Sequence, residues 1–204
     1  CASYLALPHT LAAMGAKLGA VRDIMNRRFI NAPDRFITIS GSMKQLLINR
    51  GCAKPITVVP NGIETPSTFT RKPKSSITIG LIGRMESKQK QQDFMLRTFL
   101  SHPGFGDCEL LVVGSGPDEV PLKKTAARRT NIRFLPWQED MESVYEQIDC
   151  LAIPSRYEGV PLVMLEALAR GIPVIGSARD GMKDILPQEW TFEPGNTAEL
   201  AAAF

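Results

Sequence analysis

Glu158 and Glu166 are separated by seven residues in the segment EGVPLVMLE. A carboxylate accepts several hydrogen bonds, so it suits the vicinal hydroxyl groups of a ribose or a hexose. Gly159 follows the first of these acids and lets the backbone approach a ligand closely, because it has no side chain. If Glu158 lies just before a helix and Glu166 a turn or more inside it, the two carboxylates can flank one bound molecule at different heights.

The start of that helix predicts a second kind of contact. Pro161 suits the first turn of a helix, because its φ is fixed near the helical value and its missing N–H is not needed there. The backbone N–H groups of Val160, Leu162 and Val163 would then lack partners, and free N–H groups at a helix N-terminus bind anions, above all phosphate. Two carboxylates around a phosphate site suit a ligand that combines a sugar, a diphosphate and a nucleoside.

The alternative is that both glutamates only stabilise the positive end of a helix dipole. Glu166 argues against this alternative, because it lies in an apolar stretch where a solvated carboxylate is not expected. Its neighbours there are Val163, Met164, Leu165, Ala167 and Leu168.

Basic residues follow a strand pattern at residues 77–83. Arg84 comes directly after this pattern, and Lys88 and Lys90 lie a few residues further on. An arginine and a lysine at this place would neutralise a diphosphate and stabilise it as a leaving group. The alternative is that this Lys- and Gln-rich stretch is the solvated start of a helix.

These residues need a sheet whose strand ends meet at one edge. The strands after residue 74 are apolar almost throughout, which is typical of a parallel sheet covered by helices on both faces. We expect strands at 77–83, 109–114, 131–135, 149–154 and 173–177, helices at 91–101, 117–129, 139–147 and 161–170, and a short helix after Gly181. The expected fold class is α/β, a Rossmann-like doubly wound parallel sheet, in which ligands bind outside the carboxyl ends of the strands.

The first part of the chain has a pattern of its own. A strand is expected at 4–8, a helix at 10–30, and strands at 35–40 and 56–60 around a helix at 43–51 with Ser40 or Ser42 as its cap and Gly51 at its end. From residue 61 to about residue 74 the composition is that of a linker. We therefore expect the end of a second, partial Rossmann-like domain and an interdomain linker at 1–74, and a ligand-binding domain at 75–204. Both ends look cut, so we expect a piece of a longer protein.

Composition limits the classes of protein. The chain is 44% hydrophobic and 22% charged, as in soluble globular proteins. Its net charge of +3 is too small to indicate nucleic-acid binding. No apolar run approaches the roughly 18 residues of a membrane-spanning helix. The four cysteines lie about fifty residues apart without a CxxC pair, which indicates neither a zinc site nor a disulfide framework and predicts a cytoplasmic location.

The segment IPSRYEGVPLVMLEALARGIPVIGS is similar over its whole length to retaining glycosyltransferases of the GT-B fold, in which the two glutamates form an E-x7-E motif. This family includes bacterial lipopolysaccharide, capsule and phosphatidylinositol-mannoside enzymes. The resemblance implies that residues 75–204 are its C-terminal, donor-binding domain and that the first seventy residues end its N-terminal domain. It also implies that Glu166 holds the nucleotide ribose, that Glu158 contacts the donor sugar, and that the amides from Gly159 to Leu162 face the distal phosphate.

The resemblance assigns further residues. The family has an arginine and a lysine at GR-x4-K-G, which identifies Arg84 and, if KQQD aligns with K-G-Q-D, Lys90, with Lys88 as the alternative. The sequence GSGP places Gly116 at the family's glycine-rich strand end, and the main chain of Arg133 or Leu135 would hold the base. The segment DGMKD retains Gly181 and an acid at Asp184 but lacks one glycine of the family's donor-sugar loop. His9 in LPHT would face the donor sugar, although a lone histidine is as often structural.

The resemblance implies transfer of a sugar from a nucleotide diphosphate, such as a UDP- or GDP-sugar, to a glycan or lipid-linked acceptor. No D-x-D triplet is present, so no metal is expected at the diphosphate. A basic set could touch an anionic membrane as a peripheral contact, or could simply be a solvated helix face; it consists of Lys123, Lys124, Arg128, Arg129 and Arg133. Other interpretations are a Rossmann dehydrogenase, which would need a third glycine after GSG, and a non-catalytic nucleotide-sugar-binding module or an epimerase- or phosphorylase-like relative.

Overall fold

The computed structural model describes residues 28–66, 69, 75–127 and 129–204. The strands are Phe36–Thr38 (β1), Ile56–Val58 (β2), Ile77–Ile82 (β3), Cys108–Val113 (β4), Ile132–Leu135 (β5), Cys150–Ile153 (β6), Val174–Ser177 (β7) and Thr191–Phe192 (β8). The α-helices are Gly41–Asn49 (α2), Ser87–Lys90 (α3), Gln92–Ser101 (α4), Glu119–Ala126 (α5), Glu142–Tyr145 (α6), Leu162–Ala169 (α7) and Thr197–Ala202 (α8). Two short 3-10 helices lie at Pro103–Phe105 (η2) and Gln188–Trp190 (η3).

A six-stranded parallel sheet forms the centre of residues 75–204, with the strand order β5-β4-β3-β6-β7-β8. The chain begins this sheet in the middle at β3, adds β4 and β5 on one side, and then crosses back to add β6, β7 and β8 on the other. This order is that of a Rossmann-like doubly wound sheet, and it confirms the predicted fold class. The crossing also fixes where a ligand crevice must open, between β3 and β6.

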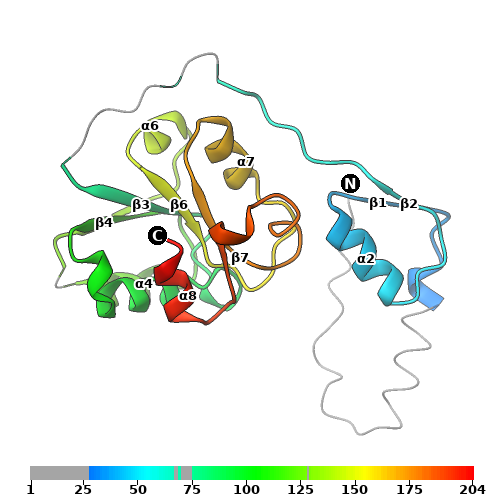
Figure 1. Cartoon of the computed structure of the whole chain (residues 1–204), viewed down its shortest axis with the longest axis horizontal. Coiled ribbons are helices and arrows are strands. Elements are labelled where there is room, and N and C mark those ends of the chain that lie inside the picture. The colour runs from blue at the N-terminus through cyan, green and yellow to red at the C-terminus, as the bar shows by residue number, and fades with distance from the viewer. Residues whose placement is uncertain (1–27, 67–68, 70–74, 128) are drawn as a thin grey trace, which may run out of the picture.

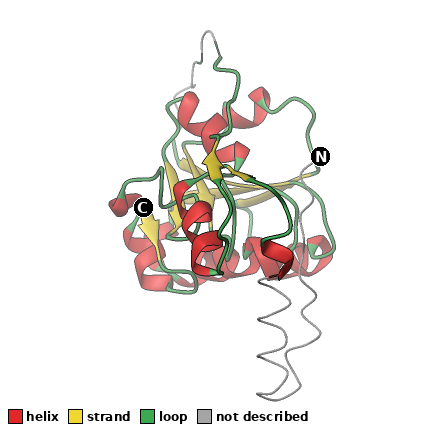
Figure 2. Ribbon diagram, turned by 90° about the vertical axis from the view of Figure 1, so that its right-hand side faces the viewer, coloured by secondary structure: helices red, strands yellow, loops and turns green. Residues whose placement is uncertain are grey.

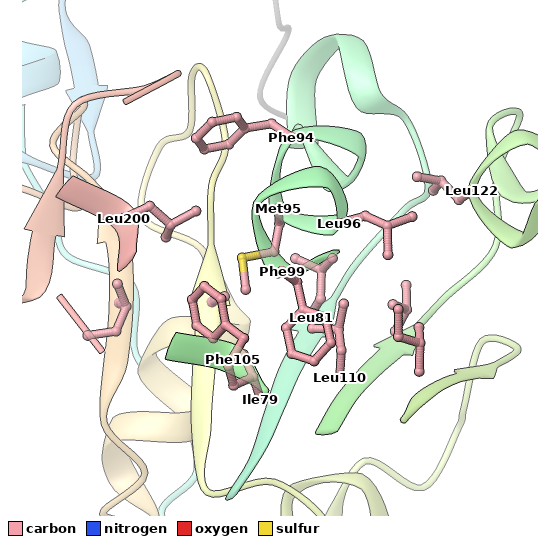
Figure 3. Close-up of a cluster of buried hydrophobic side chains, with 14 of the residues drawn as sticks. Ile79, Leu81, Phe94, Met95, Leu96, Phe99, Phe105, Leu110, Leu122 and Leu200 are labelled. Carbon is pink, nitrogen blue, oxygen red and sulfur yellow. The ribbon is translucent and has the colours of Figure 1, made fainter. Parts of the chain in front are cut away.

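Helices cover both faces of the sheet, as Figures 1 and 2 show. On one face α4, α5 and α8 pack on the sheet through buried side chains such as Met95, Leu122 and Leu200, part of the cluster drawn in Figure 3. On the other face α6 and α7 pack through Tyr145 and Met164, both without exposed surface. The two cores explain why the strands read as apolar on both faces.

The part before residue 60 forms a second, two-stranded parallel sheet of β1 and β2, next to α2. Of the two expected caps, Ser40 is the one that caps α2, because its Oγ accepts from the Met43 N–H at 3.2 Å. Gly51 follows the helix with a φ of 88°, where a glycine is favoured. The strand at 4–8 and most of the helix at 10–30 lie outside the described residues, and the domain boundary near residue 74 stays a prediction.

Two helix predictions need correction. The helix predicted at 91–101 begins only at Gln92, and a separate short helix, α3, precedes it; Gln91 lies between them with a φ of 51°. The short helix predicted after Gly181 is wrong. Residues 180–185 form successive turns instead, held by N–H groups such as that of Leu186, which donates to the Met182 carbonyl oxygen at 2.8 Å. Met182 and Leu186 are buried there, so packing on the core fixes the turns.

None of the helices in the described part of the chain has the length and apolar character that crossing a bilayer requires.

Candidate functional site

A small pocket opens at the carboxyl ends of β3 and β6. These are the neighbouring strands at which the order of the sheet reverses, so their connections leave toward opposite faces and a crevice opens between them. The polar side chains that line the pocket are those of Lys90, Gln92, Ser155 and Glu158, and Pro161 and Val163 of the loop and helix that follow line it as well.

Lys90 and Glu158 form an ion pair inside this pocket, where their side chains are 27% and 10% exposed. Ser155 Oγ donates to the same carboxylate oxygen of Glu158 at 2.9 Å. The backbone N–H of Glu158 donates to Asp180 Oδ2, also at 2.9 Å. The carboxylate and its backbone are therefore both held in place, and an ammonium group stands beside them at the carboxyl edge of the sheet.

The turn between α3 and α4 places Lys90 in the pocket. Gln91 adopts a left-handed conformation there, which ends α3 and reverses the chain into α4. Its buried amide fits between two groups of the β6–α7 loop when Nε2 donates to the Pro154 carbonyl oxygen at 2.9 Å and Oε1 accepts from Arg156 Nε at 3.1 Å. The Arg156 N–H also donates to the Gln89 carbonyl oxygen at 2.8 Å. The segment that carries Lys90 is thus pinned to the loop that carries Glu158.

The other two basic residues of this segment lie differently. The Arg84 side chain is 69% exposed, and its Nε is 3.6 Å from Glu86 Oε2. The Arg84 carbonyl oxygen accepts from Gln92 Nε2 at 2.6 Å, which fixes the backbone after β3. Lys88 is exposed and forms no ion pair with any described residue. Of the three, Lys90 is the one that the structure places in the pocket.

Glycines let the loop after β6 pack tightly. A Cβ at Gly159 would lie 2.8 Å from Ile39 Cδ1, and a Cβ at Gly181 would lie 2.4 Å from the Gly159 carbonyl oxygen. The Gly181 contact is with backbone, so a side chain there has no room, whereas a side chain at Gly159 would require the Ile39 side chain, just after β1, to move. The sequence predicted that Gly159 lets the backbone approach a ligand, and the structure shows that it also lets the loop pack against Ile39.

The helix after this loop, α7, starts one residue later than Pro161, which is its N-cap residue with φ −63° and ψ 130°. The N–H groups of Val160, Leu162 and Val163 donate to no group of the described residues. Three backbone donors are thus free at the positive end of α7, beside Glu158, which is the arrangement that binds an anion.

Glu166 lies in the middle of α7 and contacts a residue that the sequence did not single out. The Tyr145 hydroxyl donates to Glu166 Oε2 at 2.5 Å. Burial of the Tyr145 ring, together with this hydrogen bond, raises the pKa of Tyr145 well above its usual value, so the hydroxyl remains a donor. The structure thus brings Lys90 and Glu158 together in the pocket, and Glu166 is not among the residues that line it.

Three further predicted residues lie at or near the same edge of the sheet. A Cβ at Gly116 would lie 2.4 Å from the Met85 carbonyl oxygen, so the turns after β3 and β4 touch there. The Leu135 carbonyl oxygen accepts from the Gly114 N–H at 3.1 Å and belongs to the β4–β5 pairing. The Arg133 side chain is directed elsewhere, toward Gln147 Oε1 at 3.4 Å and Glu109 Oε2 at 4.0 Å.

The remaining predicted residues fall into two groups. His9 and Arg128 lie outside the described residues. Of the basic set, Lys123 pairs with Glu119 at 2.7 Å on the same helix, and Lys124 and Arg129 are exposed. The acid retained at Asp184 accepts hydrogen bonds from the Ser42 N–H, at 2.8 Å, and from the Ser42 hydroxyl.

Sequence reasoning missed three residues of the site. Tyr145, Gln91 and Gln92 act through partners that lie 21, 63 and 8 positions away in the chain, at Glu166, Pro154 and Arg84. No local pattern points to the first two. Gln92 is 3% exposed and its Oε1 has no hydrogen-bond partner among the described residues. Its helical spacing from the apolar Met95 and Leu96 is the signal that could have found it.

Both parts of the chain match known protein families. Residues 76–204 match the family model "Glycosyl transferases group 1", and residues 4–66 match "Glycosyltransferase Family 4". Among curated relatives, the lipopolysaccharide 1,6-galactosyltransferase of Escherichia coli K12 is 31% identical over 188 residues, which are 83% of this chain and 51% of that protein. A D-inositol 3-phosphate glycosyltransferase of Mycolicibacterium vanbaalenii is 29% identical over 96% of this chain and 53% of its own length. The chain thus spans about half the length of the curated relatives it matches.

Solved structures share the fold. HepE of Anabaena, in complex with UDP-glucose, superposes with a TM-score of 0.75 at 19% identity over 89% of this chain and 56% of that one. The lipopolysaccharide outer core galactosyltransferase WaaB, in its apo form, gives a TM-score of 0.74 at 22% identity over 83% of this chain and 51% of that one. With the family match covering the whole six-stranded domain, the chain belongs to the glycosyl transferases group 1 family of the GT-B fold.

Proposed function

We propose that this chain carries the donor half of a retaining glycosyltransferase, which moves a hexose from a nucleotide diphosphate sugar to a glycan or lipid-linked acceptor of the cell envelope. One observation carries the proposal: Lys90, Glu158 and the free N–H groups of α7 lie together at the crevice between β3 and β6. A diphosphate next to a sugar is the ligand whose charges and hydroxyl groups match this set.

In the proposed reaction an oxygen of the acceptor hydroxyl bonds to the anomeric carbon of the donor sugar. The bond between that carbon and the diphosphate oxygen breaks, the nucleoside diphosphate leaves with the bonding electrons, and the proton of the acceptor hydroxyl passes to the departing diphosphate or to water. Negative charge grows on the diphosphate, so Lys90, Arg84 and the start of α7 would stabilise the transition state more than the ground state. Glu158 would hold the sugar by its hydroxyl groups, and Glu166 the ribose.

Lys90 is our choice over Lys88 for the diphosphate. The left-handed conformation of Gln91 is the one that glycine adopts most easily, which fits the alignment of Gln91 with the glycine of the family's K-G pair. This alignment makes Lys90 the motif lysine, and the pocket geometry independently favours it.

The relatives suggest the class of substrate. One acts on lipopolysaccharide, another is a UDP-Gal:alpha-D-GlcNAc-diphosphoundecaprenol alpha-1,3-galactosyltransferase, and solved neighbours hold UDP or UDP-glucose. We therefore propose a UDP-sugar as the first donor to test. Because the chain spans about half of the relatives' length, we propose that turnover requires a longer protein that contains this sequence.

A panel of UDP-, GDP-, ADP- and CMP-sugars in a thermal-shift assay on the longer protein tests the donor site, since a ligand that binds only the folded state raises the melting temperature. We expect one nucleotide to raise it, and we expect the substitutions Glu166→Ala and Arg84→Ala to reduce both that shift and sugar transfer. If no donor shifts the intact protein, the proposal is wrong. A shift without transfer or donor hydrolysis would favour the alternative, a non-catalytic nucleotide-sugar-binding module.

We also propose that the diphosphate is held without a metal ion, because the sequence lacks a D-x-D triplet while basic groups are available. Transfer activity of the longer protein should therefore be unchanged by EDTA. A loss of activity that Mg²⁺ or Mn²⁺ restores would contradict this part of the proposal.

A further inference from the structure

Four side chains between α6 and α7 form a connected cluster outside the pocket. The Tyr145 hydroxyl donates to Glu166 Oε2 at 2.5 Å, and the Arg170 guanidinium stacks on the Tyr145 ring, 4.7 Å from its centre. Arg170 Nε and Nη2 both donate to Glu142 Oε2, at 3.0 and 2.6 Å. The cluster joins α6 to α7 around the second glutamate of the E-x7-E motif.

Tyr145 can act here only as a donor to the carboxylate. Its side chain is fully buried, and burial followed by the contact with Glu166 raises its pKa far above the physiological range. A buried hydroxyl that lost this acceptor would leave an unsatisfied polar group. The hydrogen bond therefore restricts the Glu166 side chain to one orientation.

Arg170 is committed to other partners. Its charge pairs with Glu142, and its Nη1 donates to the Glu166 backbone carbonyl oxygen at 3.0 Å, not to the Glu166 carboxylate. Within the described part of the chain, no group donates to Glu166 Oε1. One carboxylate oxygen is thus fixed by Tyr145 and the other is left as an acceptor.

We propose that Tyr145 is a positioning residue that aims the free oxygen of Glu166 at the ribose hydroxyl groups of the donor nucleotide, an inference that rests on the function proposed above for Glu166. A rigid charged acceptor strengthens the binding of a ligand that has a hydroxyl group in the right place, and it does not strengthen the binding of a ligand that lacks this group. Selectivity for a ribonucleotide over its 2′-deoxy analogue is therefore the property that Tyr145 should control.

The experiment compares UDP with 2′-deoxy-UDP by calorimetric titration of the longer protein, or the GDP pair if the thermal-shift panel selects guanosine. The intact protein should bind the ribonucleotide about tenfold more tightly, the usual worth of a hydrogen bond to a charged group. Tyr145→Phe keeps the ring beneath Arg170 and should lower this affinity ratio to about two, mainly because the variant binds the ribonucleotide more weakly. Tyr157→Phe is the matched control, because that side chain is 50% exposed and has no partner within the described residues.

The outcomes separate the two proposals. If the intact protein binds neither nucleotide of any pair, the proposed function fails. If it prefers the ribonucleotide and Tyr145→Phe keeps the same ratio, or if the intact protein binds both nucleotides equally, the role of Tyr145 is overturned. If Tyr145→Phe does not fold, Arg170→Met decides: loss of the guanidinium that holds the ring should lower the same ratio, and an unchanged ratio would contradict the inference.

Discussion

Lys90 places one positive charge where the proposed leaving group, the nucleoside diphosphate, would gain negative charge. Its ammonium lies in the pocket against Glu158, whereas Lys88, two residues earlier, is exposed. Lys90→Ala should lower kcat for sugar transfer by about 100-fold, the scale of losing one transition-state donor. Lys88→Ala removes the same charge from the same short helix and should leave kcat within twofold. Equal losses in both variants, measured by release of the nucleoside diphosphate, would mean that the two lysines act only through their long-range charge.

Under the proposed function, we expect Glu158 to compete with a bound diphosphate for Lys90. Without a donor, the carboxylate neutralises the ammonium, so binding of a bare nucleoside diphosphate must share or break that pair. Glu158→Gln should therefore tighten binding of UDP by up to about fivefold, the range of a partly exposed ion pair. The same variant should slow transfer, because it loses the carboxylate that we propose accepts hydrogen bonds from the sugar hydroxyl groups. Titration with UDP and the transfer assay check the two effects, and weaker UDP binding in Glu158→Gln would contradict the competition.

At the scale of elements, the left-handed turn at Gln91, between α3 and α4, sets the direction of the Lys90 side chain. A residue with a side chain costs about 1 kcal/mol in the left-handed conformation, and the two hydrogen bonds of the Gln91 amide offset this at about 1 kcal/mol each. Gln91→Ala keeps the cost and loses the bonds, whereas Gln91→Gly loses both. The glycine variant should therefore be about 1 kcal/mol more stable than the alanine variant in urea unfolding. The opposite order would show that Gln91 is not left-handed in solution.

The sequence predicted five of the six strands of the large sheet, because each of these five carries its own signal, but it did not predict the two-residue strand β8. Continuous apolar runs such as 110–113 and 150–153 are buried, and that pattern needs no knowledge of distant residues. The prediction of helices from sequence was wrong at Gln91, because a glutamine gives no sign of a left-handed turn. It was also wrong after Gly181, because the turns at 180–185 follow from the packing of Met182 rather than from local propensity. Motif spacing identified Glu158 and left Lys88 and Lys90 as alternatives, of which the structure places Lys90 in the pocket, whereas Tyr145 is apparent only from the fold.

At the scale of the whole molecule, the N-terminal part contacts the loops that build the site. Asn61 Nδ2 donates to the Val160 carbonyl oxygen at 3.2 Å, and Ile39 fills the space above Gly159. Ser42, at the start of α2, binds Asp184 in the turn after β7. The loop of Glu158 and the turn of Asp180 are therefore both supported from outside the six-stranded domain. Their partners lie about a hundred or more positions earlier in the chain, which is why no local pattern predicts these contacts.

Asp184 should make this support depend on pH. Partial burial alone would raise the pKa of Asp184, but hydrogen bonds from the Ser42 hydroxyl and N–H outweigh it and hold the pKa below its usual value. A carboxyl whose pKa is lower in the folded state stabilises that state above the unfolded pKa of about 4, and the effect is lost as the pH falls through the lowered folded pKa. Asp184→Asn should therefore lower the melting temperature at pH 7 by about 1–2 °C, a small shift because the group is exposed.

In acid, the melting temperatures of Asp184→Asn and of the intact protein should become equal. As the pH falls through the lowered pKa of Asp184, the intact protein loses the charge that the variant never had, so the difference in melting temperature should shrink toward zero. Glu189→Gln is the matched control: this acid is exposed and makes no hydrogen bond or ion pair with the described residues, so its removal should not change the melting temperature at either pH. A difference for Asp184→Asn that persists unchanged at low pH would mean that the contact with Ser42 depends on the shape of the side chain and not on its charge.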